Sequence, residues 1–173
     1  ELSRGGIVLY TSGRTAGDEL DEPIIAYSKR KYNILIGDVT AEMLKKRIGS
    51  VHPAADRGEM RVQGRNLLNG LPAIVGVSSA EIREAMEDQV QHIVESIRTT
   101  LENTPPELAA DIYDTGIMLS GGGAMLAGLP LLISRITGIR TVVAKSPIDS
   151  VVTGIGRIIE SDGISAAARF RSR

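Results

Sequence analysis

Cysteine and tryptophan are absent from this 173-residue chain, and aromatic side chains of any kind are scarce. Without cysteine, disulfide bonds and thiolate metal sites are excluded. The two histidines, His52 and His92, lie far apart in the sequence, so a histidine-based metal site is not expected either. With four Tyr and one Phe, the hydrophobic core must consist mainly of Ile, Leu, Val, Ala and Met.

An excess of charge of one sign is also lacking. Twenty basic and 21 acidic residues leave a formal net charge of -1, so no global field favours nucleic acid as a partner. No apolar run approaches the roughly 20 residues that a membrane span needs, and no signal peptide opens the chain. We therefore expect a soluble, cytosolic protein. Because the chain begins at Glu1 in the middle of a pattern, we also expect a piece of something longer.

The most informative stretch runs from residue 116 to residue 130, GIMLSGGGAMLAGLP. It predicts a strand at Ile117–Leu119, a turn at Gly121, Gly122 and Gly123, and a helix from Ala124. Such a turn presents bare N–H groups at a positive helix end, which suits a nucleotide or another anion. Glycine also lets a flat ligand approach the main chain. Ordinary turn chemistry explains the glycines equally well, and the spacing is neither a dinucleotide fingerprint nor a Walker loop.

The other elements alternate between strand and helix patterns. Helices are predicted from Asp18 to about Tyr32, over 41–48 after Thr40 as the cap, over 79–103, from 106 to near 113, and from about Ser146 to 159. Two of the capping signals, Ser78–Glu81 and Thr104–Glu107, are capping boxes. Strands are predicted at 6–12, 60–62, 73–77 and 141–144. His92 lies on the polar side of the longest helix and is interpreted as a solvated surface residue.

This order predicts an α/β protein in two parts. Residues 1–32 and 104–160 would form a parallel α/β layer, with the glycine turn at the carboxyl end of a strand, where ligands collect in open sheets. Residues 33–103 would form an inserted lobe with a small antiparallel sheet. Residues 161–173, which are small and basic in composition, would form a loose tail.

Several segments, in order, resemble MreB-type bacterial actins. They are Arg30–Asn33 with Ile36-Gly37, Gly64–Leu67 with Gly70–Pro72, Thr104–Asp111, Ser120–Ala124 and Gly154–Arg157. The resemblance runs from about Gly5 to Glu160 and is far more specific than three glycines alone. It implies the second half of an actin-like ATPase: a ribonuclease H-like layer, subdomain IIA, which carries the lobe called subdomain IIB.

The resemblance also implies a nucleotide site. Gly121, Gly122, Gly123, Ala124 and Met125 would line the adenine and ribose of ATP or ADP. Glu42 and Lys45 match the helix that closes over the nucleoside in that family. They lie three residues apart on one helical face, so both side chains could reach one ligand. The alternative is that they belong to an ordinary solvent-exposed face of the helix. Gly17 and Asp18 would approach the sugar and phosphates. Two positions depart from the family pattern. Ala16 stands where the family has glycine, and its Cβ restricts the backbone dihedral angles that this turn can adopt. Lys145-Ser146 stands where the family has an acidic pair.

The family's phosphate-binding hairpins and catalytic glutamate are not recognised in this chain. We therefore expect Mg²⁺ to be held mainly by the other half, and we expect no ATP hydrolysis by this chain alone.

The resemblance implies a cytoplasmic filament-forming protein that maintains rod shape by organising cell-wall synthesis. Its partners would be other filament subunits, a RodZ-like membrane adaptor and the elongation machinery, with the membrane reached only indirectly. Arg61, Arg65 and Arg83 are candidates for charge contacts between subunits. Two alternatives are the nucleotide-binding half of a chaperone-like or sugar-kinase-like ATPase, and an interaction module that binds no nucleotide.

Overall fold

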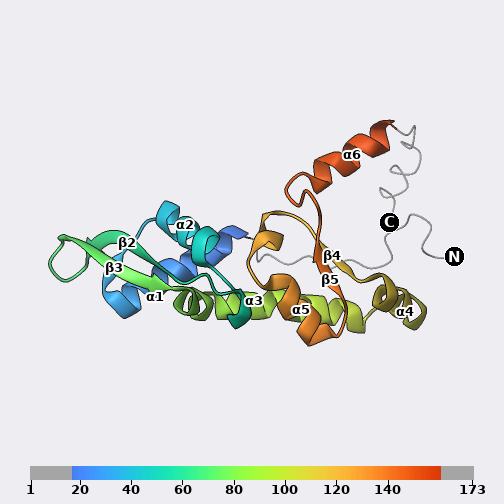
Figure 1. Cartoon of the computed structure of the whole chain (residues 1–173), viewed down its shortest axis with the longest axis horizontal. Coiled ribbons are helices and arrows are strands. Elements are labelled where there is room, and N and C mark those ends of the chain that lie inside the picture. The colour runs from blue at the N-terminus through green and yellow to red at the C-terminus, as the bar shows by residue number, and fades with distance from the viewer. Residues whose placement is uncertain (1–16, 161–173) are drawn as a thin grey trace.

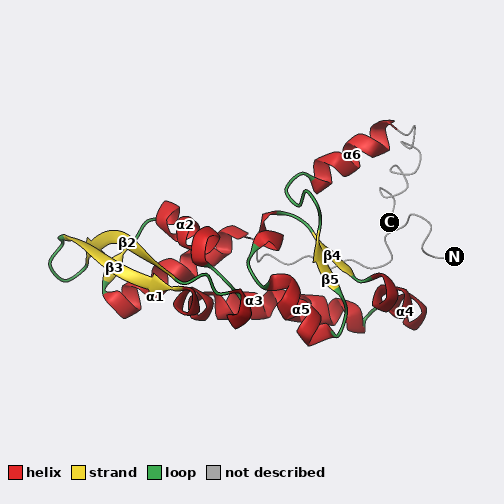
Figure 2. Cartoon of the chain, in the orientation of Figure 1, coloured by secondary structure: helices red, strands yellow, loops and turns green. Residues whose placement is uncertain are grey.

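The computed structural model describes residues 17–160, which form an elongated molecule with an antiparallel sheet at one end (Figure 1). The predicted strand at 6–12, Ala16 and the predicted tail at 161–173 lie outside the described residues. Figure 2 shows a second, smaller group of strands away from this end of the molecule.

The antiparallel sheet comprises β1 (Ile34–Leu35), β2 (Glu59–Asn66) and β3 (Pro72–Ser78), in the order β1-β2-β3. It confirms the predicted small antiparallel sheet. The strands are longer than predicted because pairing extends past the apolar cores, from Glu59 opposite Ser78 to Arg65 opposite Pro72. Two helices lie before the hairpin, α1 (Asp21–Tyr32) and α2 (Asp38–Ile48).

The first of these helices begins after a 3-10 turn at Gly17–Leu20. The second begins three residues earlier than predicted, because Gly37 is the N-cap and its carbonyl accepts hydrogen bonds from the N–H groups of Thr40 and Ala41. Both helices carry basic residues in the last turn, which is favourable at the negative end of a helix dipole.

The longest helix, α3 (Ser79–Glu102), runs from the hairpin to the far side of the molecule (Figure 1). Its predicted capping box is confirmed: the Ser78 side chain accepts from the Glu81 N–H, and the Glu81 carboxylate accepts from the Ser78 N–H. Ile82, Met86 and Val90 form a buried stripe, while His92 is exposed as predicted.

The second capping box, predicted at 104–107, is wrong. The Thr104 hydroxyl donates instead to the Thr100 carbonyl in the preceding helix. The next helix, α4 (Pro106–Thr115), therefore has Pro105 as its N-cap, without a side-chain cap. Proline at the first helical position is as predicted.

Beyond α4, strands β4 (Ile117–Leu119) and β5 (Thr141–Val143) pair in parallel, as the α/β prediction requires. Between them, the predicted helix is present but its predicted start at Ala124 is wrong: residues Gly122–Met125 form a 3-10 turn, and α5 spans Leu129–Thr137. Gly128, with φ +84°, separates the two because its left-handed backbone breaks the helical run. The last helix, α6 (Ser150–Glu160), follows a turn at 147–149 and so begins later than predicted.

One continuous core joins the sheet end to the α5 end. It contains Ile24 and Leu44 from α1 and α2, Ile82 from α3, and Leu129 and Ile133 from α5. In space, α1 lies mainly against α2 and α3. The predicted boundaries between the α/β layer and the inserted lobe, at 32/33 and 103/104, stay a prediction. A core shared by both parts does not show where one part ends and the other begins.

Candidate functional site

A cavity of about 700 Å³ lies between α2 and the glycine turn. From the side of α1 and α2 it is lined by Leu20, Lys45, Lys46, Gly49 and Arg57. From the opposite side it is lined by Gly122, Gly123, Met125, Leu126, Ala127 and Ile148. The tertiary fold thus brings the glycine turn and the lysine-bearing helix, which are distant in sequence, to the same cavity.

The main chain itself forms one wall of this cavity. A Cβ atom placed on Gly122 or Gly123 would meet no atom within 4 Å, so the space in front of the turn is open. Gly121 has φ +84°, and its N–H donates to the Pro147 carbonyl at 2.7 Å, which anchors the turn to the segment before α6. A flat ligand can therefore lie against this backbone.

The last two residues of the turn point in different directions. Ala124 is 5% exposed and does not line the cavity, so it supports the turn from behind. Met125 is 58% exposed and does line the cavity, next to Leu126 and Ile148. These three side chains give the cavity an apolar section.

The opposite wall is cationic. Lys45 Nζ lies 2.8 Å from Asp21 Oδ1, with both side chains largely buried, and this ion pair ties α2 to the start of α1. Lys46 Nζ lies 2.6 Å from Glu42 Oε1, and the hydrogen bond from Lys46 lowers the pKa of the Glu42 carboxyl. Arg57 donates from Nη1 to the Lys46 carbonyl at 3.3 Å.

Glu42 and Lys45 thus engage different partners, and only Lys45 is among the residues that line the cavity. Lys46, Arg57 and Ile148 line it without having been singled out from the sequence. Lys46 could have been found, because it follows Glu42 by one helical turn. Arg57 and Ile148 come from loops and reach the cavity only through the tertiary fold.

Gly17 and Asp18 lie in the 3-10 turn Gly17–Leu20 that precedes α1. Leu20, the last residue of that turn, is 2% exposed and lines the cavity. Gly17 and Asp18 therefore belong to the same turn as a residue that lines the cavity.

Ala127, which lines the cavity, also takes part in the junction between the lobe and the α5 side. The Val51 N–H donates to the Ala127 carbonyl at 2.9 Å, and Ser50 forms an isolated parallel bridge with Ala127. A Cβ on Gly128 would lie 2.9 Å from the Cβ of His52, so only glycine allows this close approach. His52 Nε2 also lies 3.4 Å from Arg135 Nη1 in α5.

Arg83 is engaged inside the chain. Its guanidinium forms an ion pair with Asp56, which also accepts from the buried Ser50 hydroxyl. The hydrogen bond from Ser50, together with Arg83, lowers the pKa of Asp56. This cluster fixes the segment after α2 onto α3.

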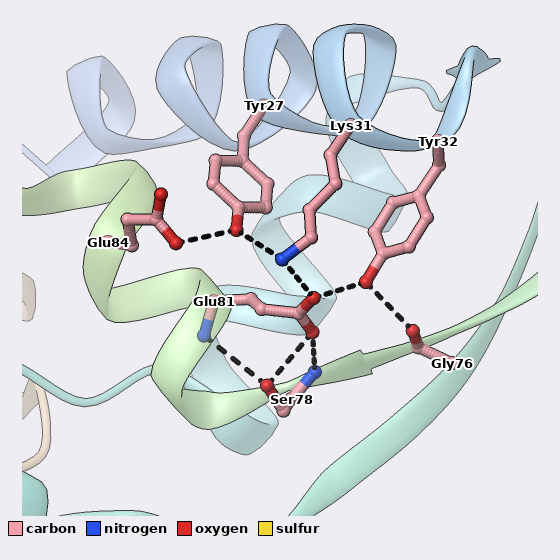
Figure 3. A network of polar contacts seen from close by, with 7 residues as sticks. All are labelled: Tyr27, Lys31, Tyr32, Gly76, Ser78, Glu81 and Glu84. Atoms are coloured by element: carbon pink, nitrogen blue, oxygen red, sulfur yellow. Dashed lines mark hydrogen bonds and ion pairs between the residues drawn. The ribbon is translucent and has the colours of Figure 1, made fainter.

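A second polar network holds α1 on the start of α3 (Figure 3). Lys31 Nζ donates to Glu81 Oε1 at 2.7 Å and to the Tyr27 hydroxyl at 3.0 Å, while the Tyr27 hydroxyl donates to Glu84 at 2.7 Å. Tyr32 donates to Glu81 as well. Burial alone would raise the pKa of Glu81, but the hydrogen bonds from Lys31 and Tyr32 lower it to about 2.

Within residues 17–160, no cluster of His, Cys, Asp and Glu has the geometry of a metal site. Over the same residues, no helix has the length and apolar character needed to cross a bilayer.

Comparison with known proteins identifies the family. The family model described as MreB/Mbl protein matches residues 2–165. The chain belongs to the MreB/Mbl family. It is 43% identical over 159 residues to the cell shape-determining protein MreB of Escherichia coli (strain K12), covering 92% of this chain and 46% of that protein. It is 41% identical over 160 residues to the cell shape-determining protein Mbl of Bacillus subtilis (strain 168), covering 92% of this chain and 48% of that one.

Solved structures agree with this assignment. MreB 5 of Spiroplasma citri bound to AMPPNP superposes with a TM-score of 0.88 at 34% identity, covering 95% of this chain and 49% of that one. The MamK double helical filament, with a TM-score of 0.63 at 24% identity over 77% of this chain and 41% of that one, supports the fold alone. The predicted actin-like α/β fold and the resemblance to MreB-type actins are confirmed, and a chaperone or sugar kinase is not favoured. The chain spans about half the length of the relatives it matches.

Proposed function

We propose that this MreB/Mbl chain forms the nucleoside-binding half of an actin-like, ATP-binding, filament-forming protein. One observation carries the proposal: the open backbone of Gly122 and Gly123 faces the cationic end of α2 across a cavity of about 700 Å³. That size lies within the usual range for small-molecule sites, about 300–1,000 Å³. The match to a family member crystallised with AMPPNP supports nucleotide binding.

The residues present fit a nucleotide. Gly121, Gly122 and Gly123 would let an adenine and ribose lie flat against the main chain, and Met125 would pack on the base. Lys45 and Lys46 would contribute positive charge near the phosphates. Glu42 would act through its ion pair with Lys46, by holding that ammonium in place.

The metal would be held mainly elsewhere. Since the described residues contain no candidate metal cluster, Mg²⁺ bound to the nucleotide would take its protein ligands from the half that this chain does not cover. Hydrolysis also needs a positioned water beside metal-bridged phosphates. We expect no phosphate release above background when the 173-residue chain alone is incubated with ATP and Mg²⁺; turnover that Gly122→Trp abolishes would contradict this.

In the whole protein, this chain would serve as subdomain IIA (1–32 and 104–160) carrying subdomain IIB (33–103). The proposal includes self-association into cytoplasmic, membrane-associated filaments that maintain cell shape by organising wall synthesis. A RodZ-like adaptor and the elongation machinery would be its partners. Open head-to-tail contacts between identical subunits give such filaments.

Binding of fluorescently labelled ADP tests the site. The change Gly122→Trp places an indole in the open space before the turn, so we expect it to weaken ADP binding at least about tenfold. Gly76→Trp is the matched control, because a side chain there also meets open space but lies outside the cavity. Equal affinities for both variants and the wild type, or no ADP binding by the wild type, would contradict the proposal. Loss of ADP binding with retained adaptor binding would favour an interaction module that uses no nucleotide.

A further inference from the structure

Two of the five methionines lie at the surface of the molecule. Met118 in β4 is 71% exposed and Met125 is 58% exposed, whereas Met86 is buried in the core. Met43 and Met60 are partly buried and pack against the core. Of the two exposed thioether side chains, only Met125 lines the cavity between α2 and the glycine turn. The fold therefore places one accessible methionine at the candidate nucleotide site.

No more reactive sulfur group competes with these methionines for an oxidant. The chain has no cysteine, so no thiolate can react first or form a mixed disulfide. A thioether is oxidised without losing a proton, and its susceptibility follows its exposure. Met118 and Met125 are therefore the sulfur groups that a peroxide reaches first, ahead of Met86.

The surroundings of Met125 make its oxidation state matter for binding. Met125 shares the apolar section of the cavity with Leu126 and Ile148, whose side chains have no hydrogen-bond donor. A sulfoxide oxygen on Met125 is polar, and water can hydrate it while the cavity is empty. A flat base packed on Met125 would remove that water without replacing its hydrogen bonds, which carries a cost in binding free energy.

We propose that Met125 is an oxidation site that controls nucleotide binding, with hydrogen peroxide as the oxidant. A lone pair of the thioether sulfur attacks one peroxide oxygen, and the O–O bond breaks as the S–O bond forms. The proton of the new S–OH group passes to the departing hydroxide, which gives the sulfoxide and water. Sulfur loses two electrons and the peroxide gains them. The inference rests on the proposed function, since that function places a base on Met125.

Oxidation and nucleotide binding would oppose each other in both directions, because the two are linked through one side chain. A base that covers Met125 shields its sulfur from peroxide, and a sulfoxide at Met125 weakens the binding of the base. Met118 provides the contrast: it is at least as exposed but does not line the cavity. Its oxidation should neither depend on the nucleotide nor change nucleotide affinity.

Treatment of the full 173-residue chain with hydrogen peroxide, with and without saturating ADP, tests the protection. After catalase has removed the peroxide, mass spectrometry of proteolytic peptides gives the sulfoxide fraction at each methionine. We expect ADP to slow the oxidation of Met125 at least about fivefold and that of Met118 less than about twofold. This measurement uses the wild type alone, so it does not depend on how a variant folds.

Binding of labelled ADP before and after peroxide tests the effect on affinity, with each protein compared with its own untreated sample. The wild type and Met118→Leu should lose affinity about tenfold, and Met125→Leu less than about twofold. Methionine sulfoxide reductases for the two sulfoxide epimers should restore the affinity of the wild type. Its unfolding temperature should not change on oxidation, because the methionines that react first are exposed.

Three results would overturn the inference. The first is ADP affinity that stays the same when Met125 is fully oxidised. The second is ADP that does not protect Met125, or that protects Met118 equally. The third is a loss of affinity after peroxide that is as large in Met125→Leu as in the wild type. Failure of the proposed function looks different: the untreated wild type would then bind no ADP, and the inference would fall with it.

Discussion

Replacing Glu81 with glutamine tests whether the network in Figure 3 fixes α1 on α3. The Glu81 carboxylate accepts from Lys31, Tyr32 and the Ser78 N–H, and its pKa falls from 4.5 to about 2. At about 1.4 kcal/mol per pKa unit, this shift corresponds to an upper limit of about 3.5 kcal/mol. Since the Lys31 side chain is 44% exposed, solvent screening reduces the value, and we expect Glu81→Gln to destabilise the chain by about 1–2 kcal/mol at pH 7.

The pH dependence gives the sharper test. A carboxyl whose pKa is lowered on folding contributes stability above its unfolded pKa, and that stability is lost as pH falls through the folded pKa. The difference in unfolding free energy between wild type and Glu81→Gln should therefore be constant above about pH 5 and shrink between 4.5 and about 2.

Urea unfolding followed by circular dichroism at pH 7, 5 and 3 measures this difference. Glu102→Gln is the control, since Glu102 forms an exposed ion pair with Arg98 on the same helix and should matter by at most about 0.5 kcal/mol. A difference for Glu81→Gln that stays the same from pH 7 to pH 3 would refute the electrostatic account of the network.

Two further substitutions test the junction and the core. Gly128→Ala should destabilise the chain by about 2 kcal/mol, because the added methyl meets His52 at a backbone with φ +84°; Gly70→Ala, with φ +74° and open space around it, should cost about 1 kcal/mol and isolates the backbone part of the effect. Ile133→Ala should cost about 2–5 kcal/mol, because Ile133 is 1% exposed in the core shared by α5 and α3. Thermal unfolding measures all three, and equal effects of the two glycine changes would rule out a steric contribution from His52.

Periodicity and local capping determined most helices and strands. The stripe of Ile82, Met86 and Val90 requires a helix buried on one side, and the Ser78–Glu81 capping box sets its first residue. Both features act over a few residues, so they could be predicted from the sequence. Where local signals compete, prediction failed: the Thr104 hydroxyl had a carbonyl of the preceding helical turn within reach, and it donates there instead of capping α4.

Sequence alone also pointed to the glycine turn and to the family, because family motifs are strings of residues in order. It could not decide which side chains share the cavity. Lys45 forms an ion pair with Asp21, and Glu42 forms one with Lys46. Arg57 and Ile148 reach the cavity from loops. The Glu42–Lys46 pair is local to α2, whereas the other placements depend on how distant segments pack against one another. Such contacts between distant segments are set by packing of the shared core, a property that no local pattern encodes.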